Sequence, residues 1–569
     1  MRKNAFSLLV VGTVYGCLNL ATSHQVQAVP LALSPQTGHP SNGLLTADTA
    51  GNSIAASLSD IEALQWALDI LNTVDGSLMK SLMAVDIAIA LDRLDERERA
   101  LALLEKTRES TTIIEQPEDR ATVLNAVANA YGQLQETEIA LVVLDQTLDI
   151  IDTIDIITNR DQGSKTSSLT HAAKTYIQLG ETESALNLLN QSLETVDAID
   201  PPRTAFFRLL DIGRTYGQLD QTDQALVVLG QALTRADQIE RTQDQCRALA
   251  DVAIAYDQLD QGERAQTILE EALIMVEAFS PPAGDFRDFR GDHAYDVYNF
   301  DAYALHVIVQ AASQLQDRPK GLAVLEKSQA VANSMDDAGS IFRAWHSIAV
   351  GYEQLGETGQ ALAALAKALS VVGTVDHDVL TQADGLSDIA LVYERLGKRE
   401  QALTLFDRAS QVAGKIDFLE GKVDVLSDIA RGYKQLGQPE KSMAVLERAE
   451  EDIAVMAVRD SSAEFNGWKT IVAAYIQLGY EEQAQRILET LLADLDTVEK
   501  DWVKVFVLNN VASSAGELQD REKALGILAD VYVGYGSLGE ENRNSLTMLF
   551  MVNALMELVD SARVPVLVD

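Results

Sequence analysis

The sequence predicts an all-α protein made of repeated helix pairs, and three observations carry this prediction. A short phrase recurs along most of the chain, each copy holds two amphipathic stripes, and small residues occupy the same two places in nearly every copy. Helix pairs that cannot cover their own apolar faces become stable when they stack in series. We therefore expect one long array of helices and not a set of separate globules.

The composition suits such an array and excludes two classes of partner. Of the 569 residues, 47% are hydrophobic, which is enough for a continuous core. The chain has 45 Lys and Arg against 85 Asp and Glu, a net charge of −40. Such a surface repels nucleic acid and anionic membranes. With only Cys17 and Cys246 present, we expect no internal disulfide in the mature chain.

Residues 1–28 have the form of a secretory signal peptide. Arg2 and Lys3 precede an apolar run to about Leu20, and a polar stretch ends at Ala28. We therefore expect an exported protein, periplasmic or secreted. Two alternatives stay open: an uncleaved membrane anchor, and lipidation at Cys17, since Val14 to Cys17 resembles a bacterial lipobox. Residues 29–57 are rich in Pro, Gly, Ser and Thr, which predicts a flexible linker.

The repeat is anchored on a leucine that usually follows glutamine. Most spacings between successive anchors are 40 to 45 residues, and one is 56. The eleven anchors are Leu94, Leu134, Leu179, Leu219, Leu259, Leu315, Leu355, Leu396, Leu436, Leu478 and Leu518. A fixed period of this length is typical of helical repeat proteins. We predict a repeat array over residues 78–540.

Each unit reads as a helix, a tight turn and a second helix. In one unit, Leu209, Ile212, Tyr216 and Leu219 form the apolar stripe of the first helix, and a second stripe begins at Leu226. The residue after the anchor is often glycine, which can adopt the left-handed conformation that ends a helix. Asp or Gln fills this place in other units.

Small residues, mostly Ala, stand six positions before and six after nearly every anchor, and tyrosine often stands three before it. The small residues allow the two helices of a unit to approach closely, and the larger side chains interlock around them. This pattern resembles the tetratricopeptide repeat (TPR) family, in a long-unit variant of about 40 residues of bacterial exported type. The resemblance covers about residues 78–535 and implies a right-handed α-solenoid that binds proteins or peptides.

The two ends are predicted to cap the array. Residues 58–77 read as an unpartnered second helix, and residues 541–569 as a mostly apolar capping helix with a tail. A terminal unit needs such a cover because one of its apolar faces has no neighbour.

No catalytic, metal-binding or cofactor-binding motif is present, so we expect no enzyme activity, no cofactor and no metal. Aspartate recurs eight positions before the anchor, as at Asp211 and Asp251, and we interpret it as structural. Glutamine precedes the anchor in eight of the eleven units, and we expect it to form a hydrogen-bonded ladder between units. An alternative role for this glutamine is ligand contact.

The spacing of 56 marks an insertion at residues 280–303 that is dense in Asp and aromatic residues. Its candidate binding residues are Phe286, Phe289, Tyr295, Tyr298 and Tyr303. Long loops are often functional, so an alternative function is small-ligand, carbohydrate or calcium binding, or an enzyme-like role, centred here. Alternatively, these aromatics pack back on the solenoid.

The family resemblance implies a concave groove lined by the first helices, with the residues five, nine and twelve before each anchor pointing into it. At these positions six side chains are Lys or Arg, and two, Asp384 and Asp424, are Asp. The predicted groove residues are Asn125, Asn129, Lys174, Arg214, Arg247, His306, Gln310, Arg343, His346, Arg431, Lys469 and Asn509. Basic and amide side chains favour a protein or peptide partner with acidic groups or a free carboxylate. The cations could instead balance nearby acids, and a passive spacer is a third possible role.

Overall fold

The computed structural model describes residues 58–74, 77–154, 159–278, 300–373, 379–456, 462–498, 500–538 and 545–561. Within these ranges the chain forms 24 α-helices, two short 3-10 helices and no strand. The predicted all-α fold is confirmed. None of the helices in these ranges is long and apolar enough to span a bilayer.

Eleven consecutive helix pairs follow the eleven predicted units, and the two helices of each pair pack against each other. The pairs are α4 (Ser77–Asp92) with α5 (Arg97–Ser110), α6 (Pro117–Gln133) with α7 (Thr137–Asp152), α8 (Asn159–Gln178) with α9 (Thr182–Val196), α10 (Pro202–Gln218) with α11 (Thr222–Ala236), α12 (Thr242–Asp257) with α13 (Gly262–Ala278), α15 (Phe300–Gln314) with α16 (Arg318–Ser334), α17 (Ala338–Gln354) with α18 (Thr358–Val372), α19 (Val379–Arg395) with α20 (Arg399–Ala413), α21 (Leu419–Gln435) with α22 (Pro439–Met456), α23 (Ser462–Gln477) with α24 (Glu481–Ala493), and α25 (Asp501–Gly516) with α26 (Arg521–Ser537).

In nine of the eleven units the turn ends the first helix in the predicted left-handed conformation, and the exceptions are Gln316 and Gln519. At Gly180 φ is +82°, the Gly180 amide donates to the Ile177 carbonyl over 3.0 Å, and the Glu181 amide donates to the Tyr176 carbonyl over 2.9 Å. This is a Schellman motif. Aspartate or glutamine adopts the same positive φ where glycine is absent, at Asp95, Gln135, Asp220 and Asp260. The predicted turn is therefore confirmed in both of its chemical forms.

Small residues let the two helices of a unit approach closely, as predicted. The Ala residues six before and six after the anchors are fully buried in most units, for example Ala128 and Ala140. At Gly321, a Cβ atom would lie only 2.3 Å from the backbone oxygen of Ala312 on the facing helix. Only glycine permits this approach between α15 and α16.

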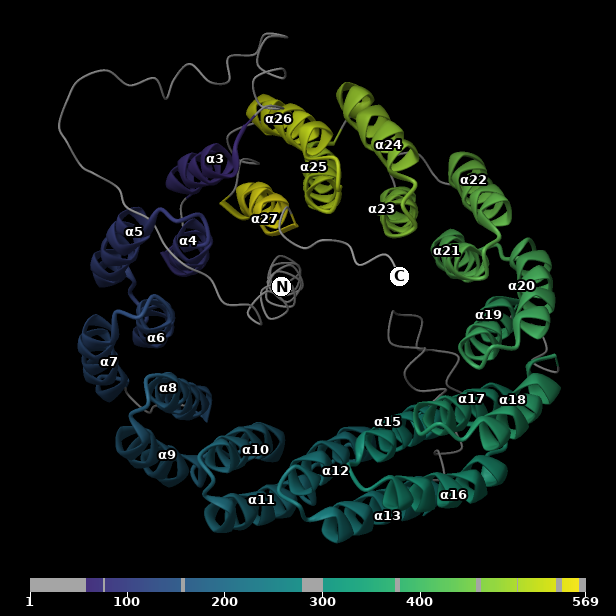
Figure 1. Cartoon of the computed structure of the whole chain (residues 1–569), viewed down its shortest axis with the longest axis horizontal. Helices are drawn as coiled ribbons and strands as arrows, with labels where there is room; N and C mark the ends of the chain where they lie inside the picture. Colours follow the sequence, from purple (N-terminus) through teal and green to yellow (C-terminus); the bar gives the residue numbers. More distant parts are fainter. Residues whose placement is uncertain are drawn as a thin grey trace.

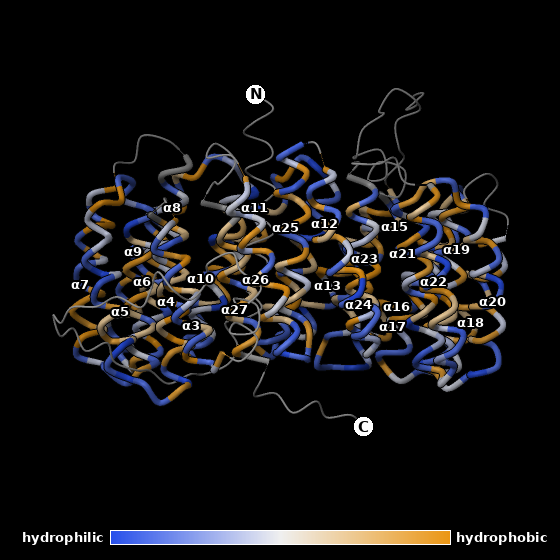
Figure 2. The backbone as a smooth tube through the Cα atoms, turned by 90° about the horizontal axis from the view of Figure 1, so that it is seen from above, coloured by the Kyte–Doolittle hydropathy of each residue, from blue (hydrophilic) through white to orange (hydrophobic). Residues whose placement is uncertain are grey.

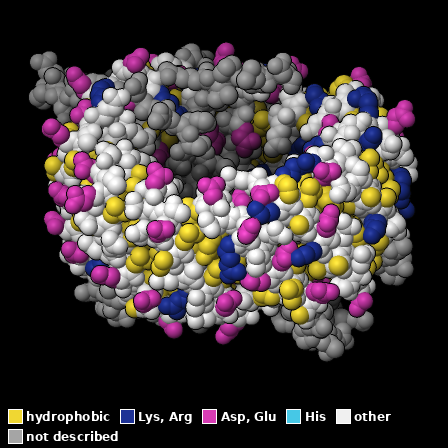
Figure 3. All heavy atoms as spheres, turned by 60° about the horizontal axis from the view of Figure 1, so that its bottom comes forward, with side chains coloured by type: hydrophobic (Ala, Val, Ile, Leu, Met, Phe, Trp, Pro, Cys, Tyr) yellow, Lys and Arg dark blue, Asp and Glu magenta, His cyan; other side chains and the backbone are white. Residues whose placement is uncertain are grey.

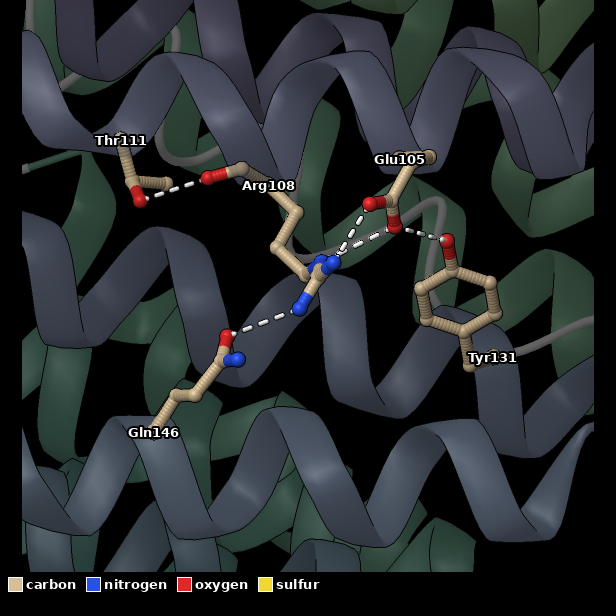
Figure 4. Close-up of polar contacts among 5 residues, drawn as sticks. All are labelled: Glu105, Arg108, Thr111, Tyr131 and Gln146. Atoms are coloured by element: carbon tan, nitrogen blue, oxygen red, sulfur yellow. Dashed lines mark hydrogen bonds and ion pairs between the residues drawn. The ribbon is translucent and has the colours of Figure 1, made fainter.

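The recurring tyrosine joins neighbouring units. Its ring is mostly buried, and in most units its hydroxyl bonds a polar side chain on the second helix of the preceding unit, as Tyr216 does to Asn190 over 2.9 Å. Figure 4 shows one such contact: Tyr131 donates to Glu105 over 3.4 Å, and Arg108 binds both Glu105 and Gln146. These residues thus connect α5, α6 and α7.

The array closes into a ring. Figure 1 shows the first helix of every unit on the inside of an oval and the second helix on the outside. Seen edge-on in Figure 2, the helices run side by side across the height of a belt. Figure 3 shows the hollow that the ring surrounds, and interspersed acidic and basic side chains on the visible outer face. The predicted groove is therefore the inner wall of a ring.

The two end helices do not form separate caps, and this corrects the sequence-based expectation. Helix α27 (Ser545–Ser561) lies inside and packs against α3 (Asp60–Thr73), which lies outside (Figure 1). Together they make a twelfth unit from the two ends of the chain, in which α27 also contacts α25 and α4. We call the contact between α27 and α3 the seam. The apolar faces that needed covers therefore cover each other.

A regular sequence signal marks this closing unit. Leu558 lies 40 residues after Leu518, and small or branched residues flank it at the repeat positions: Val552 six before, and Ala63 at the start of α3. Arg318 Nε donates to the carbonyl of the next anchor, Leu355, over 2.7 Å, and Arg521 Nη1 donates in the same way to Leu558 over 3.2 Å. Leu558 is therefore the twelfth anchor.

The insertion does not interrupt the stacking of units. Helix α15 packs directly on α12, and α16 packs on α13. The Gln316 amide donates to Asp257 over 2.8 Å, and the Gln316 side chain donates to the Asp257 carbonyl over 2.9 Å. Both bonds join the units on either side of the insertion. Four of the five insertion candidates, Phe286, Phe289, Tyr295 and Tyr298, lie outside the described residues.

Candidate functional site

The inner wall carries a repeating polar pattern that joins successive units. The side chain five before one anchor reaches the aspartate eight before the next anchor: Lys174 Nζ lies 2.5 Å from Asp211, and Arg214 donates to the Asp251 carbonyl over 3.1 Å. Arg431 instead pairs with Asp428 of its own unit. Asp211, Asp251 and Asp428 thus make structural contacts with three of the predicted groove cations.

The glutamine before the anchor takes part in the same pattern. Asn129 donates to Gln178 of the next unit and accepts from Gln133 of its own unit over 2.5 Å. Ser313 and Arg431 likewise donate to Gln354 and Gln477 of the following units. The predicted ladder between units is confirmed at these three junctions.

The largest enclosed group of predicted groove residues lies beside the seam. A cavity of about 560 Å³ opens on the inner wall over α27, α4, α6 and α8, and Asn125, Asn129 and Lys174 all line it. We call it the seam cavity. Its other polar lining side chains are Asp86, Arg93, Thr122, Gln133, Ser168, His171, Thr175, Gln178, Asn553 and Glu557, and its apolar ones include Met83, Ile89 and Met556.

Carboxylates and amides give the seam cavity its chemistry. Burial raises the pKa of Asp86 to about 6. Burial, and then repulsion from Glu517, raise the pKa of Glu557 to about 7, although the Asn553 side chain donates to Glu557 over 2.7 Å. The Oε2 atom of Glu557 is buried without a hydrogen-bond partner, as is Oδ1 of Asn125. Both side chains line the cavity, and these oxygens keep an unused capacity to accept a hydrogen bond.

A second hollow follows on the inner side at the next units. It has a volume of about 580 Å³ and is lined by Arg214, Gln218 and Gln258, among others. Arg247 lies nearby in α12, is exposed, and together with Arg214 opposes the burial that raises the pKa of Asp251. On this stretch of the inner wall, Arg247 is therefore a predicted groove cation whose side chain is exposed.

The histidines and Arg343 form a further cluster on α15, α17 and α19. His306 Nδ1 lies 3.1 Å from the Ser347 hydroxyl, and burial lowers the pKa of His346 to about 4, with a further effect of Arg395. Arg343 is half-buried, its Nε has no hydrogen-bond partner, and it faces Asp384 and Asp388.

The other predicted residues lie apart from these clusters. Gln310 and Lys469 are exposed, Lys469 near Glu517, and Tyr303 is 38% exposed. Asn509 accepts a hydrogen bond from Tyr535 over 2.5 Å, so its side chain is held by α26. The structure thus spreads the twelve predicted groove residues around the ring and gathers three of them in one cavity.

Sequence reasoning missed the contribution of α27. Asn553 and Glu557 lie five and one positions before the anchor Leu558, the places that Asn129 and Gln133 occupy before Leu134. Had Leu558 been counted as an anchor, the same positional rule would have found Asn553. No group of His, Cys, Asp or Glu within the described ranges is arranged to hold a metal ion. Cys246 is buried there, and burial raises the pKa of its thiol to about 12.

No protein-family model and no curated protein matches the chain. Among solved structures, it is similar to the kinesin light chain TPR-like repeats of Podosopora anserina, with 17% identity over 35% of this chain and 96% of that one, at a TM-score of 0.27. It is also similar to a Rap protein complexed with competence and sporulation factor, with 13% identity over 69% and 100% of the two chains and a TM-score of 0.24. A circular tandem repeat protein aligns over 84% of this chain and 98% of its own, with 13% identity and a TM-score of 0.19. The helical-repeat architecture rests on this chain's own helix pairs.

Proposed function

We propose that this protein is a scaffold that binds protein or peptide segments on the inner wall of the ring, without catalysis of its own. The seam cavity is the observation that carries the proposal, because it combines amide side chains, buried acceptor atoms and apolar side chains on one concave surface. An extended peptide offers main-chain donors and acceptors to such amides, and side chains to the apolar positions.

The preference of the partner for acidic groups stays a prediction. Lys174, Arg214 and Arg431 are engaged by the chain's own groups, so that preference now depends on the stretch of wall around Arg247 and Arg343 and on the exposed Lys469. Export also remains part of the proposal, because the predicted signal and linker lie outside the described residues.

Peptide selection tests the proposed function. A random dodecapeptide library displayed on phage is selected against the full chain, and the affinities of the enriched peptides are measured by fluorescence anisotropy. We expect Asn129→Ala, Arg247→Glu or Arg343→Glu to weaken the enriched peptides by about tenfold or more, since each changes a side chain on the inner wall.

Arg264→Glu is the matched control, because Arg264 lies on the outer helix α13 of the same unit as Arg247 and is also partly exposed. The proposal predicts little effect from this change. Enriched peptides that bind all inner-wall variants as tightly as the unmodified chain would refute it, as would peptides that respond equally to Arg264→Glu.

A further inference from the structure

The seam cavity is built from both ends of the chain. Met83, Asp86 and Ile89 come from α4 near the start, and Asn553, Met556 and Glu557 come from α27 near the end. Among the described residues, packing of α27 on α3, α4 and α25 holds these two sets together. The cavity therefore has this form only while the ring is closed.

Contacts remote from the cavity help to fasten the seam. Arg521 Nη1 lies 2.6 Å from Asp60, and Arg521 also donates to the carbonyls of Leu558 and Leu58. Trp66 of α3 meets Tyr532 of α26 edge to face, with ring centroids 6.0 Å apart. None of these side chains lines the cavity. The seam can therefore be weakened without changing the surface that would meet a ligand.

The carboxyl groups of the cavity that lack an ion pair favour a basic ligand. The acids that line the seam cavity are Asp86 and Glu557, and Glu517 lies near Glu557. Neither Asp86 nor Glu557 forms an ion pair with a cation within the described residues. The cavity's cations are Arg93 and Lys174, of which Lys174 is held by Asp211, and His171 lies beside them. The net charge of −40 adds a long-range attraction for basic segments.

We propose that the seam cavity binds an extended polypeptide segment through a basic side chain directed at Asp86 and Glu557, and that this binding and closure of the ring stabilise each other. The inference rests on the proposed function and deepens it by naming the binding site, the chemistry of the ligand and the ring closure that controls binding. The coupling is reciprocal: a ligand that needs both ends of the chain favours the closed ring, and a weakened seam lowers the affinity for the ligand.

The test uses the full chain and two fluorescein-labelled dodecapeptides, one alternating alanine with arginine and one alternating alanine with glutamate. Anisotropy measures affinity, and small-angle X-ray scattering measures the radius of gyration. Seam variants are Arg521→Ala with Trp66→Ala, and Ala63→Asp, which places a charge in the buried face of α3, a helix that packs on α27. Cavity variants are Asp86→Asn and Glu557→Gln.

We expect the arginine peptide to bind the unmodified chain better than the glutamate peptide. The affinity for the arginine peptide should fall about tenfold when both cavity variants are combined, and at least about fivefold in the seam variants. The seam variants should also enlarge the ring without peptide, and saturating arginine peptide should restore its radius. Arg318→Ala is the control, because Arg318 makes the same bond to the next anchor carbonyl but lies between two units that the chain connects directly. This change should alter neither the affinity for the arginine peptide nor the radius of gyration.

The outcomes separate this inference from the proposed function. Equal affinity for open and closed rings overturns the coupling, and equal affinity for the two peptides overturns the basic ligand, while inner-wall binding of selected peptides still stands. A ring that stays closed in Ala63→Asp overturns the seam as the point of closure. Failure of the library selection to yield any inner-wall peptide overturns the proposed function and this inference together.

Discussion

At the scale of single residues, the chain repeats a few polar contacts that lock one unit to the next. The tyrosine three before the anchor is an example, since its ring fills the interface while its hydroxyl finds a polar side chain one unit back. Tyr433 donates to Asp407 over 2.5 Å, whereas no hydrogen bond is formed by the equivalent Tyr393 hydroxyl in the described part of the chain. Comparing the two tyrosines therefore separates the contribution of the hydroxyl hydrogen bond to stability from that of the buried ring.

Tyr433→Phe should lower the free energy of unfolding by about 1–2 kcal/mol, because it removes a hydrogen bond to a charged acceptor. Tyr393→Phe, at the same place in the preceding unit, should change it by less than about 0.5 kcal/mol. Urea unfolding followed by circular dichroism gives both values. Equal losses in the two variants would show that the hydroxyl contact has no role in stability.

A second residue-scale prediction concerns the acids on the inner wall. Burial, and then repulsion from Asp388, raise the pKa of Asp384, against the attraction of Arg343. An acid with a raised folded-state pKa binds its proton more tightly in the folded state, so its ionisation destabilises the fold as the pH rises. Asp428 and Asp424 also face Asp384 and act in the same direction.

Asp384→Asn should therefore stabilise the protein at pH 8, by on the order of 1 kcal/mol. The gain should shrink as the pH falls through the raised pKa and vanish near pH 4, about the pKa of an unfolded aspartate, below which the wild-type group is neutral in both states. Thermal melts of both proteins between pH 4 and 8 measure this difference. A gain that is constant with pH would exclude ionisation as its cause.

At the scale of the element, the turn within each unit sets where the first helix ends. Gly180 is the cleanest case, because its φ is +82° and a Cβ atom there would meet no atom within 4 Å. Any loss on adding a methyl group thus reports the backbone conformation alone.

Gly180→Ala should destabilise the protein by about 1 kcal/mol through this strain. Gly526 offers the matched opposite case: it also has free space around its Cβ position, but it lies inside α26 with ordinary helical φ. Gly526→Ala should therefore stabilise by about 0.5–1 kcal/mol. Chemical denaturation measures both, and the same sign for the two variants would contradict the account.

At the scale of the whole molecule, closure decides the architecture. The closing unit buries apolar side chains from both ends of the chain, including Leu64 and Ile70 of α3 and Val552 and Leu555 of α27. Each fully buried side chain of this size contributes about 1.5–3 kcal/mol. The two ends are therefore held together by burial like that within any other unit, but without a covalent turn.

A circular permutant tests this arrangement. It joins Ser561 to residue 58 through a short turn and opens new ends at residue 499, between α24 and α25. Because α27 and α3 become covalently linked, the entropy cost of closing the seam falls. We expect the permutant to keep the radius of gyration of the native ring, as measured by small-angle scattering. A larger radius would mean that the native ring does not pair α27 with α3.

The sequence alone determined the eleven helix pairs, their turns and their small-residue contacts, because all of these are set by residues close together along the chain. It also located the side chains of the inner wall through their distance from each anchor. The regular position of Leu558 was present in the sequence as well, but its meaning depended on a partner almost 500 residues away.

Only the tertiary structure decided that the array closes, because a small rotation per unit, summed over twelve units, determines whether the ends meet. Closure in turn decided the candidate site. It brings Asp86 and Glu557, from opposite ends of the chain, to one cavity, whereas the stacking of neighbouring units pairs Lys174 with Asp211. Such pairings depend on how units stack, which no local pattern of residues specifies.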